Sequence, residues 1–144
     1  MTPELLIEYA AMICRIAFGI WNIFFGLVFF GFFIEQPMGH GKMTPYLNQT
    51  LIDTGLFHIV KAIEIVVGVM LVLNIGTPLA LVVYAPITVV IFHVNMFLEE
   101  TPFLGPFVAV VYLIVHLFLL WAYRGYYSDL LVWDSTITQG ISLL

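Results

Sequence analysis

Two residues of opposite charge, Lys61 and Glu64, lie three positions apart near the middle of a long apolar stretch. Residues at i and i+3 are neighbours on a helix, so the ammonium and the carboxylate can pair directly. A charge inside a membrane-spanning helix costs at least about 2.5–3.5 kcal/mol on insertion scales, so it needs a partner and indicates function. The pair is predicted either to fix helix packing as a self-neutralising ion pair or to carry a proton or polarise a ligand.

Further polar residues gather toward one end of the apolar stretches. His58 precedes Lys61 by one turn, and the spacing places it on the face of Lys61 and Glu64. The next stretch runs back across the membrane and ends near His93, so it brings that residue to the same side. We therefore expect a polar cavity in the half of the bundle where the second stretch begins and the third ends. This half lies away from both chain termini and is expected to be the non-cytoplasmic one. Its expected lining is His58, Lys61, Glu64, His93, Asn95 and His116.

Three ligand chemistries compete for this cavity. A quinone is favoured, because an aromatic bundle suits its ring and His, Lys or Tyr donors suit its oxygens. A divalent metal could use His58, His93 and a carboxylate, although no HxxxH or ExxH pair marks such a site, and no metal is expected. Haem held between the same two histidines is less favoured still. His116 alone is more typical of hydrogen bonding between helices.

Four charge-poor stretches must position these side chains. Each is close to the roughly 20 apolar residues that an α-helix needs to cross about 30 Å of hydrocarbon. The predicted fold is all-α, a four-helix transmembrane bundle over residues 1–127 with spans at about 9–34, 55–73, 79–98 and 103–123. The tail, 128–144, is too short and polar to span, and it could lie along the membrane interface or contact a partner.

Composition supports the same class of protein. The 144 residues are 62% hydrophobic and 9% charged, whereas a soluble domain is about 25% charged. The formal charge of −5 offers no basic surface for nucleic acid. Cys14 is the single cysteine, which excludes a disulfide within the chain and a CxxC redox pair. The expected surroundings are a lipid bilayer and other membrane subunits or further copies of the chain.

Small residues and prolines predict how the helices pack. The first helix should begin with Pro3 at its first position, and a 4-3-4 spacing gives it one buried face, formed by Arg15, Gly19, Asn22 and Gly26. Gly68 should likewise allow close approach in the second span. Pro86 is expected to kink the third span. Residues 35–54 carry Pro and Gly breakers and are expected to form one long loop, which could cover the bundle end.

The positive charges outside the spans predict an orientation. Arg15 and Arg124 flank the side of both termini, and Lys42 lies on the other side. The positive-inside rule then places both termini in the cytoplasm. The expected location is a bacterial inner membrane.

Several short segments resemble the DoxX family of small four-span membrane proteins. They are Arg15-Ile-Ala-Phe-Gly19, Phe25-Gly26, Lys61-Ala-Ile-Glu64-Ile-Val-Val-Gly68, Pro78-Leu-Ala-Leu, Ala85-Pro86-Ile and Ala122-Tyr-Arg124. Many family members carry a Lys after the second glycine of the first span, where this chain has Gly26-Leu-Val-Phe-Phe.

The resemblance implies a fold and a setting rather than a reaction. Relatives in the DoxX family include a membrane subunit of a thiosulfate:quinone oxidoreductase, and others are associated with redox-stress partners. The expected function is therefore an accessory or quinone-interacting subunit of a membrane redox system. The alternative is a non-enzymatic structural or assembly subunit packed on a larger membrane complex. The resemblance supplies no catalytic residues.

Overall fold

The first helix begins where the sequence predicts. The computed structural model of the chain describes residues 2–130, and in it α1 runs over Pro3–Phe29 with Pro3 in its first turn and Glu4 beside it. Proline suits this position because its missing N–H would have no partner there. The helix ends at Phe29, five residues before the expected end at 34. Gly31 and Phe33 have φ of +88° and +71°, which a continuing α-helix cannot adopt.

Three further long helices follow α1. They are α3 (Leu56–Leu73), α4 (Thr77–His93), which the π-helical turn η1 (Val94–Leu98) extends, and α5 (Leu104–Ala122). Together with α1, they are long and apolar enough to cross a membrane by length and composition. Within residues 2–130 there is no strand. The predicted all-α bundle of four membrane-spanning helices is confirmed. The chain therefore belongs to the class of multi-pass membrane proteins.

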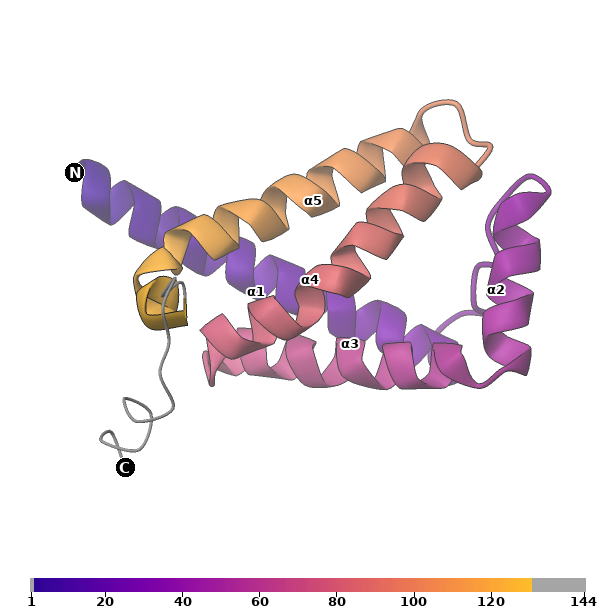
Figure 1. The fold of residues 1–144 in the computed structure, drawn as a ribbon, viewed down its shortest axis with the longest axis horizontal. Helices are drawn as coiled ribbons and strands as arrows, with labels where there is room; N and C mark the ends of the chain where they lie inside the picture. Colours follow the sequence, from indigo (N-terminus) through magenta and orange to yellow (C-terminus); the bar gives the residue numbers. More distant parts are fainter. Residues whose placement is uncertain (1, 131–144) are drawn as a thin grey trace.

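The four long helices are arranged as a ring of neighbours. Helix α1 packs along α3 and also contacts α5, while α4 contacts α3 and α5 (Figure 1). Helices α3 and α4 meet at a tight turn, where Asn74 and Gly76 adopt left-handed backbone conformations. From this turn the two helices diverge, and the shorter helix α2 (Met43–Asp53) stands across the far end (Figure 1).

Helix α2 contradicts the prediction of one long loop over residues 35–54. The breakers that suggested a loop lie before it or in its first turn. Pro45 is the third helical residue, and a proline is tolerated there because the first N–H groups of a helix have no intrahelical partner. The segment does cover one end of the bundle, because α2 contacts both α3 and η1.

Glycines set the distance between α1 and α3. A Cβ atom on Gly19 would lie 2.8 Å from the carbonyl oxygen of Gly68, and one on Gly68 would lie 2.7 Å from that of Gly19. At Gly26, a Cβ would meet Ile65 at 2.5 Å. The face of Arg15, Gly19, Asn22 and Gly26 is buried as predicted. These contacts explain why small residues occur at this crossing.

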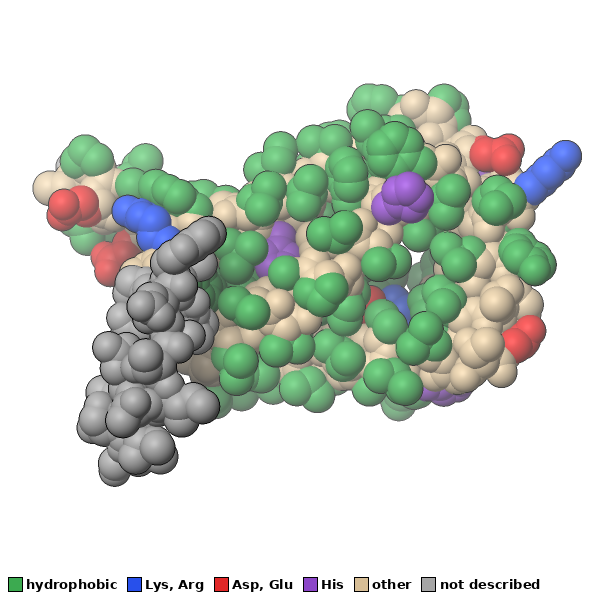
Figure 2. All heavy atoms as spheres, viewed as in Figure 1, with side chains coloured by type: hydrophobic (Ala, Val, Ile, Leu, Met, Phe, Trp, Pro, Cys, Tyr) green, Lys and Arg blue, Asp and Glu red, His purple; other side chains and the backbone are tan. Residues whose placement is uncertain are grey.

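The outer surface is apolar and the polar residues are drawn inward or to the ends. Large hydrophobic side chains are exposed along all four long helices, and Figure 2 shows them covering most of this face. Pro86 lies inside α4, which continues past it to His93, and the kink stays a prediction. After α5, a 3-10 helix, η2 (Arg124–Leu130), ends the described part. The expected interfacial tail, 128–144, lies almost wholly outside the described residues.

Candidate functional site

Lys61 and Glu64 form an ion pair inside the bundle. Their Nζ and Oε2 atoms are 2.9 Å apart, and both residues are buried on the α3 face that α1 covers at Gly26. The Lys61 ammonium also lies 5.1 Å from the centroid of the Phe57 ring, one turn earlier. A cation–π contact of this kind helps to hold an ammonium group away from water. The predicted i,i+3 pairing is therefore the geometry observed.

The pair retains hydrogen-bonding capacity that the protein does not use. An ammonium group has three donors and an ionised carboxylate has two acceptor oxygens. Lys61 donates one hydrogen bond, to Glu64 Oε2, while Glu64 Oε1 accepts none from any described residue. Within residues 2–130, the fully buried side-chain atoms that lack a hydrogen-bond partner belong to Gln36 and Thr44. Glu64 Oε1 also lacks a partner but is not one of these atoms, so it is not fully buried. The free oxygen of Glu64 is thus reachable from a space beside it.

That space is visible on the surface. Figure 2 shows a hollow bounded by α2, α3 and α4, with a basic and an acidic side chain at its bottom. Figure 1 shows α3 and α4 diverging toward the end of the bundle where α2 lies. The rim of the hollow is apolar, which suits entry from the hydrocarbon of a bilayer.

A directed chain of hydrogen bonds crosses the bundle beside the ion pair. The Tyr112 hydroxyl donates to Asn22 Oδ1 at 2.6 Å, and Asn22 Nδ2 donates to the Phe18 carbonyl at 2.8 Å. Tyr112 has one proton, so the 2.7 Å contact between the two tyrosine hydroxyls must be donated by Tyr84. Both tyrosine protons are committed within this chain.

His116 is fully partnered and has no free nitrogen. Its Nε2 lies 3.0 Å from the Leu81 carbonyl, which can only accept, so Nε2 carries the proton. Its Nδ1 then accepts from the Thr88 hydroxyl. The ring also stacks on Tyr84 at 6.0 Å between centroids. This is the interhelical hydrogen-bonding role that a single histidine in a membrane span predicts.

The structure does not bring the six predicted residues into one cavity. His58 is exposed near the start of α3 and lies against the rings of Phe29 and Phe30. His93 is exposed at the end of α4. Both histidines lie near helix ends and are exposed, so neither belongs to the buried polar core.

Asn95 is the remaining predicted residue, and its side chain serves its own helix. Its Nδ2 donates to the Ile91 carbonyl at 2.9 Å, four residues earlier. Of the predicted lining, Lys61 and Glu64 remain together in one ion pair, and His116 lies against Tyr84 in the core.

Arg15 occupies the opposite end of the α1–α3 contact. Its guanidinium is buried and donates to the carbonyl of Leu71 in the last turn of α3. A helix C-terminus carries unsatisfied carbonyl groups and a partial negative charge, so a cation is stabilised there. Arg15 therefore links α1 to α3 and is not part of the Lys61–Glu64 site.

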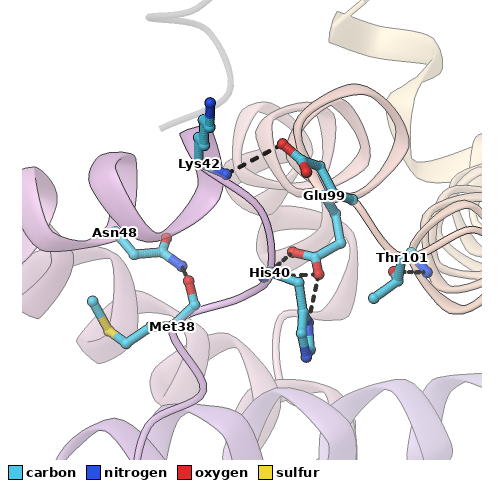
Figure 3. Close-up of polar contacts among 8 residues, drawn as sticks. Met38, His40, Lys42, Asn48, Glu99 and Thr101 are labelled. Carbon is cyan, nitrogen blue, oxygen red and sulfur yellow. Dashed lines mark hydrogen bonds and ion pairs between the residues drawn. The ribbon is translucent and has the colours of Figure 1, made fainter.

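Two carboxylates fasten the segment before α2 to the connection between η1 and α5. Glu99 accepts from the His40 backbone N–H at 2.9 Å and lies 2.8 Å from Nδ1 of its ring (Figure 3). Glu100 accepts from the Lys42 backbone N–H at 3.2 Å. We call these contacts between Glu99, Glu100 and residues 40–42 the latch.

The latch depends on glycine at two positions. Gly39 and Gly41 both have φ of +85°, and a Cβ on either would run into a latch carboxylate side chain. Asn48 of α2 adds a 2.8 Å hydrogen bond to the Met38 carbonyl (Figure 3). The latch holds α2 at the end of the bundle, where it borders the hollow.

Among the described residues, no group of three or more His, Cys, Asp or Glu side chains could hold a metal ion. No protein-family model, curated protein or solved structure matches the chain. The resemblance to the DoxX family therefore stays a prediction.

Sequence reasoning missed Tyr84 and Thr88 as partners in the polar core. Both are buried on α4, four residues apart, and they face Tyr112 and His116, which have the same spacing on α5. The matching i,i+4 pairs in the third and fourth spans were the available signal.

Proposed function

We propose that this chain is a membrane-embedded quinone-binding protein that serves as an accessory subunit of a membrane redox system. The supporting observation is the Lys61–Glu64 pair, which is buried and keeps donors and an acceptor unused, with Glu64 Oε1 not fully enclosed by the protein. Buried polar groups ordinarily have partners, so unused ones beside a space indicate a bound molecule or water.

A quinone suits these surroundings better than a soluble metabolite. Its ring and tail are apolar, and the hollow opens between helices whose outer faces are apolar. Its carbonyl oxygens accept hydrogen bonds, which the unused Lys61 protons can supply. The resemblance to the DoxX family supports a redox setting, a bacterial inner membrane and other membrane subunits as partners. The excess of Arg15 and Arg124 over Lys42 supports cytoplasmic termini.

The direct test is the quinone content of the protein purified in mild detergent. Wild type would be compared with the double variant Lys61→Met, Glu64→Gln, which removes both charges together and so leaves neither one unpaired. His93→Phe is the matched control, because His93 is exposed and lies away from the pair. We expect quinone in wild type and in the control, and loss of it in the double variant. Equal content in all three, or none in any, would contradict the proposal.

One observation favours a structural subunit instead. The hydrogen bonds of Asn22, Tyr84 and Tyr112 form a continuous chain within the protein. Those of Thr88 and His116 are also made to other groups of the protein. A polar core satisfied in this way can serve packing alone. Absence of bound quinone, together with co-purification of a larger membrane complex, would favour this alternative.

A further inference from the structure

We infer that the site beside Lys61 and Glu64 prefers the hydroquinone form of its ligand over the quinone form. The inference rests on the proposed function and deepens it. It follows from the charge of the pair and from which hydrogen-bonding atoms the protein leaves unused.

The charge of the site selects a neutral ligand. Lys61 and Glu64 are 2.9 Å apart and sum to zero. Of the other basic residues, Arg15 is committed to the far end of α3, while Lys42 and Arg124 lie outside the four long helices. An anionic ligand would thus add a charge with no free partner, which is strongly unfavourable in a low-dielectric interior.

The unused atoms call for a ligand that both donates and accepts. Glu64 Oε1 needs a donor, and the free Lys61 protons need an acceptor. A hydroxyl group meets both needs, because its hydrogen donates and its oxygen accepts. A quinone has carbonyl oxygens only, so it would pair with Lys61 and leave the buried Glu64 oxygen without a donor.

The tyrosine, threonine and histidine donors that link α4 to α5 and α1 do not supply the missing donor. The Tyr112 proton goes to Asn22, and the Tyr84 proton goes to Tyr112. The hydroxyl of Thr88 and the Nε2 proton of His116 are equally committed. A ligand hydroxyl would therefore form a charge-assisted O–H···O⁻ bond that these four side chains do not supply.

The test compares a short-chain benzoquinone with its hydroquinone on the full-length protein in detergent. Dissociation constants would be measured without oxygen, and with excess reductant for the hydroquinone arm. One charge-assisted hydrogen bond predicts that the hydroquinone binds roughly tenfold more tightly or better. His93→Phe should keep that ratio. In Lys61→Met, Glu64→Gln the ratio should fall toward one, because Gln can also donate to a carbonyl.

The outcomes separate this inference from the proposed function. Equal affinities in wild type, or tighter quinone binding, would overturn the preference and leave quinone binding intact. Binding of neither form would overturn both. A double variant that fails to fold would not affect the wild-type comparison, which alone decides the preference.

Discussion

Gly19 and Gly68 face each other where α1 crosses α3, so closely that a Cβ atom on either would lie within 2.8 Å of the other's carbonyl oxygen. Gly68 and the ion-pair residues Lys61 and Glu64 are all buried residues of α3, which packs along α1. In a bilayer, such close approach contributes packing and not a hydrophobic gain, because lipid tails are as apolar as the side chains.

Gly68→Val should destabilise the bundle. The added side chain would meet the backbone of α1, which cannot move aside as a flexible side chain can. Overpacking of this kind typically costs about 1–3 kcal/mol. Thermal unfolding in detergent would measure it, with Ala62→Val on the exposed face of α3 as the control. Equal midpoints for the two variants would contradict the close contact.

Tyr112→Phe should cost more stability than Tyr84→Phe. Removing the Tyr112 hydroxyl leaves Asn22 Oδ1 without a donor and Tyr84 without an acceptor. Removing the Tyr84 hydroxyl leaves the Tyr112–Asn22 bond in place. Each buried group left unpaired costs about 1–3 kcal/mol. Unfolding midpoints would show the order, and the reverse order would contradict the assigned direction of the chain.

Breaking the latch should loosen residues 39–53 while the four long helices stay folded. Glu99→Gln with Glu100→Gln replaces charge-assisted bonds to backbone N–H groups by weaker neutral ones. Hydrogen exchange followed by mass spectrometry should show faster exchange in 39–53. Glu35→Gln is the control, because Glu35 is exposed. Unchanged exchange in the double variant would show that the latch does not hold α2.

Lys61→Met alone should destabilise the bundle more than Lys61→Met with Glu64→Gln. The single change leaves a buried carboxylate without its cation, whereas the double change leaves no net charge. Breaking one partner of a buried pair costs about 3–5 kcal/mol. Unfolding in detergent would compare the two variants, and identical midpoints would show that the two residues do not stabilise each other.

The sequence predicts the helices well and the polar contacts less well, for physical reasons. Apolar runs bounded by Pro and Gly identify the four spans, and the 3.6-residue period identifies the buried face of α1. Which residues pair between two helices depends on how the helices are shifted relative to each other. The periodicity within each helix does not indicate that shift, so the sequence does not predict the Thr88–His116 contact. His58 shares the helical face of Lys61 but lies in the first turn of α3, where it is exposed beside Phe29 and Phe30 at the end of α1.

Helix α2 was missed for a different reason. It is short and polar, and it follows a run of Pro and Gly, so its local signals are those of a loop. The segment before it is held by Glu99 and Glu100, which lie 59 and 58 residues after the His40 and Lys42 groups that they bind.

The most direct measurement of the central claim is quinone per mole of purified protein, determined in lipid extracts of wild type, of Lys61→Met with Glu64→Gln, and of His93→Phe. Quinone binding at the ion pair predicts bound quinone in wild type and His93→Phe, with a fall of about tenfold for each ~1.4 kcal/mol of hydrogen bonding lost in the double variant. Equal content in a folded double variant, or no quinone in any sample, would contradict a quinone site at Lys61 and Glu64.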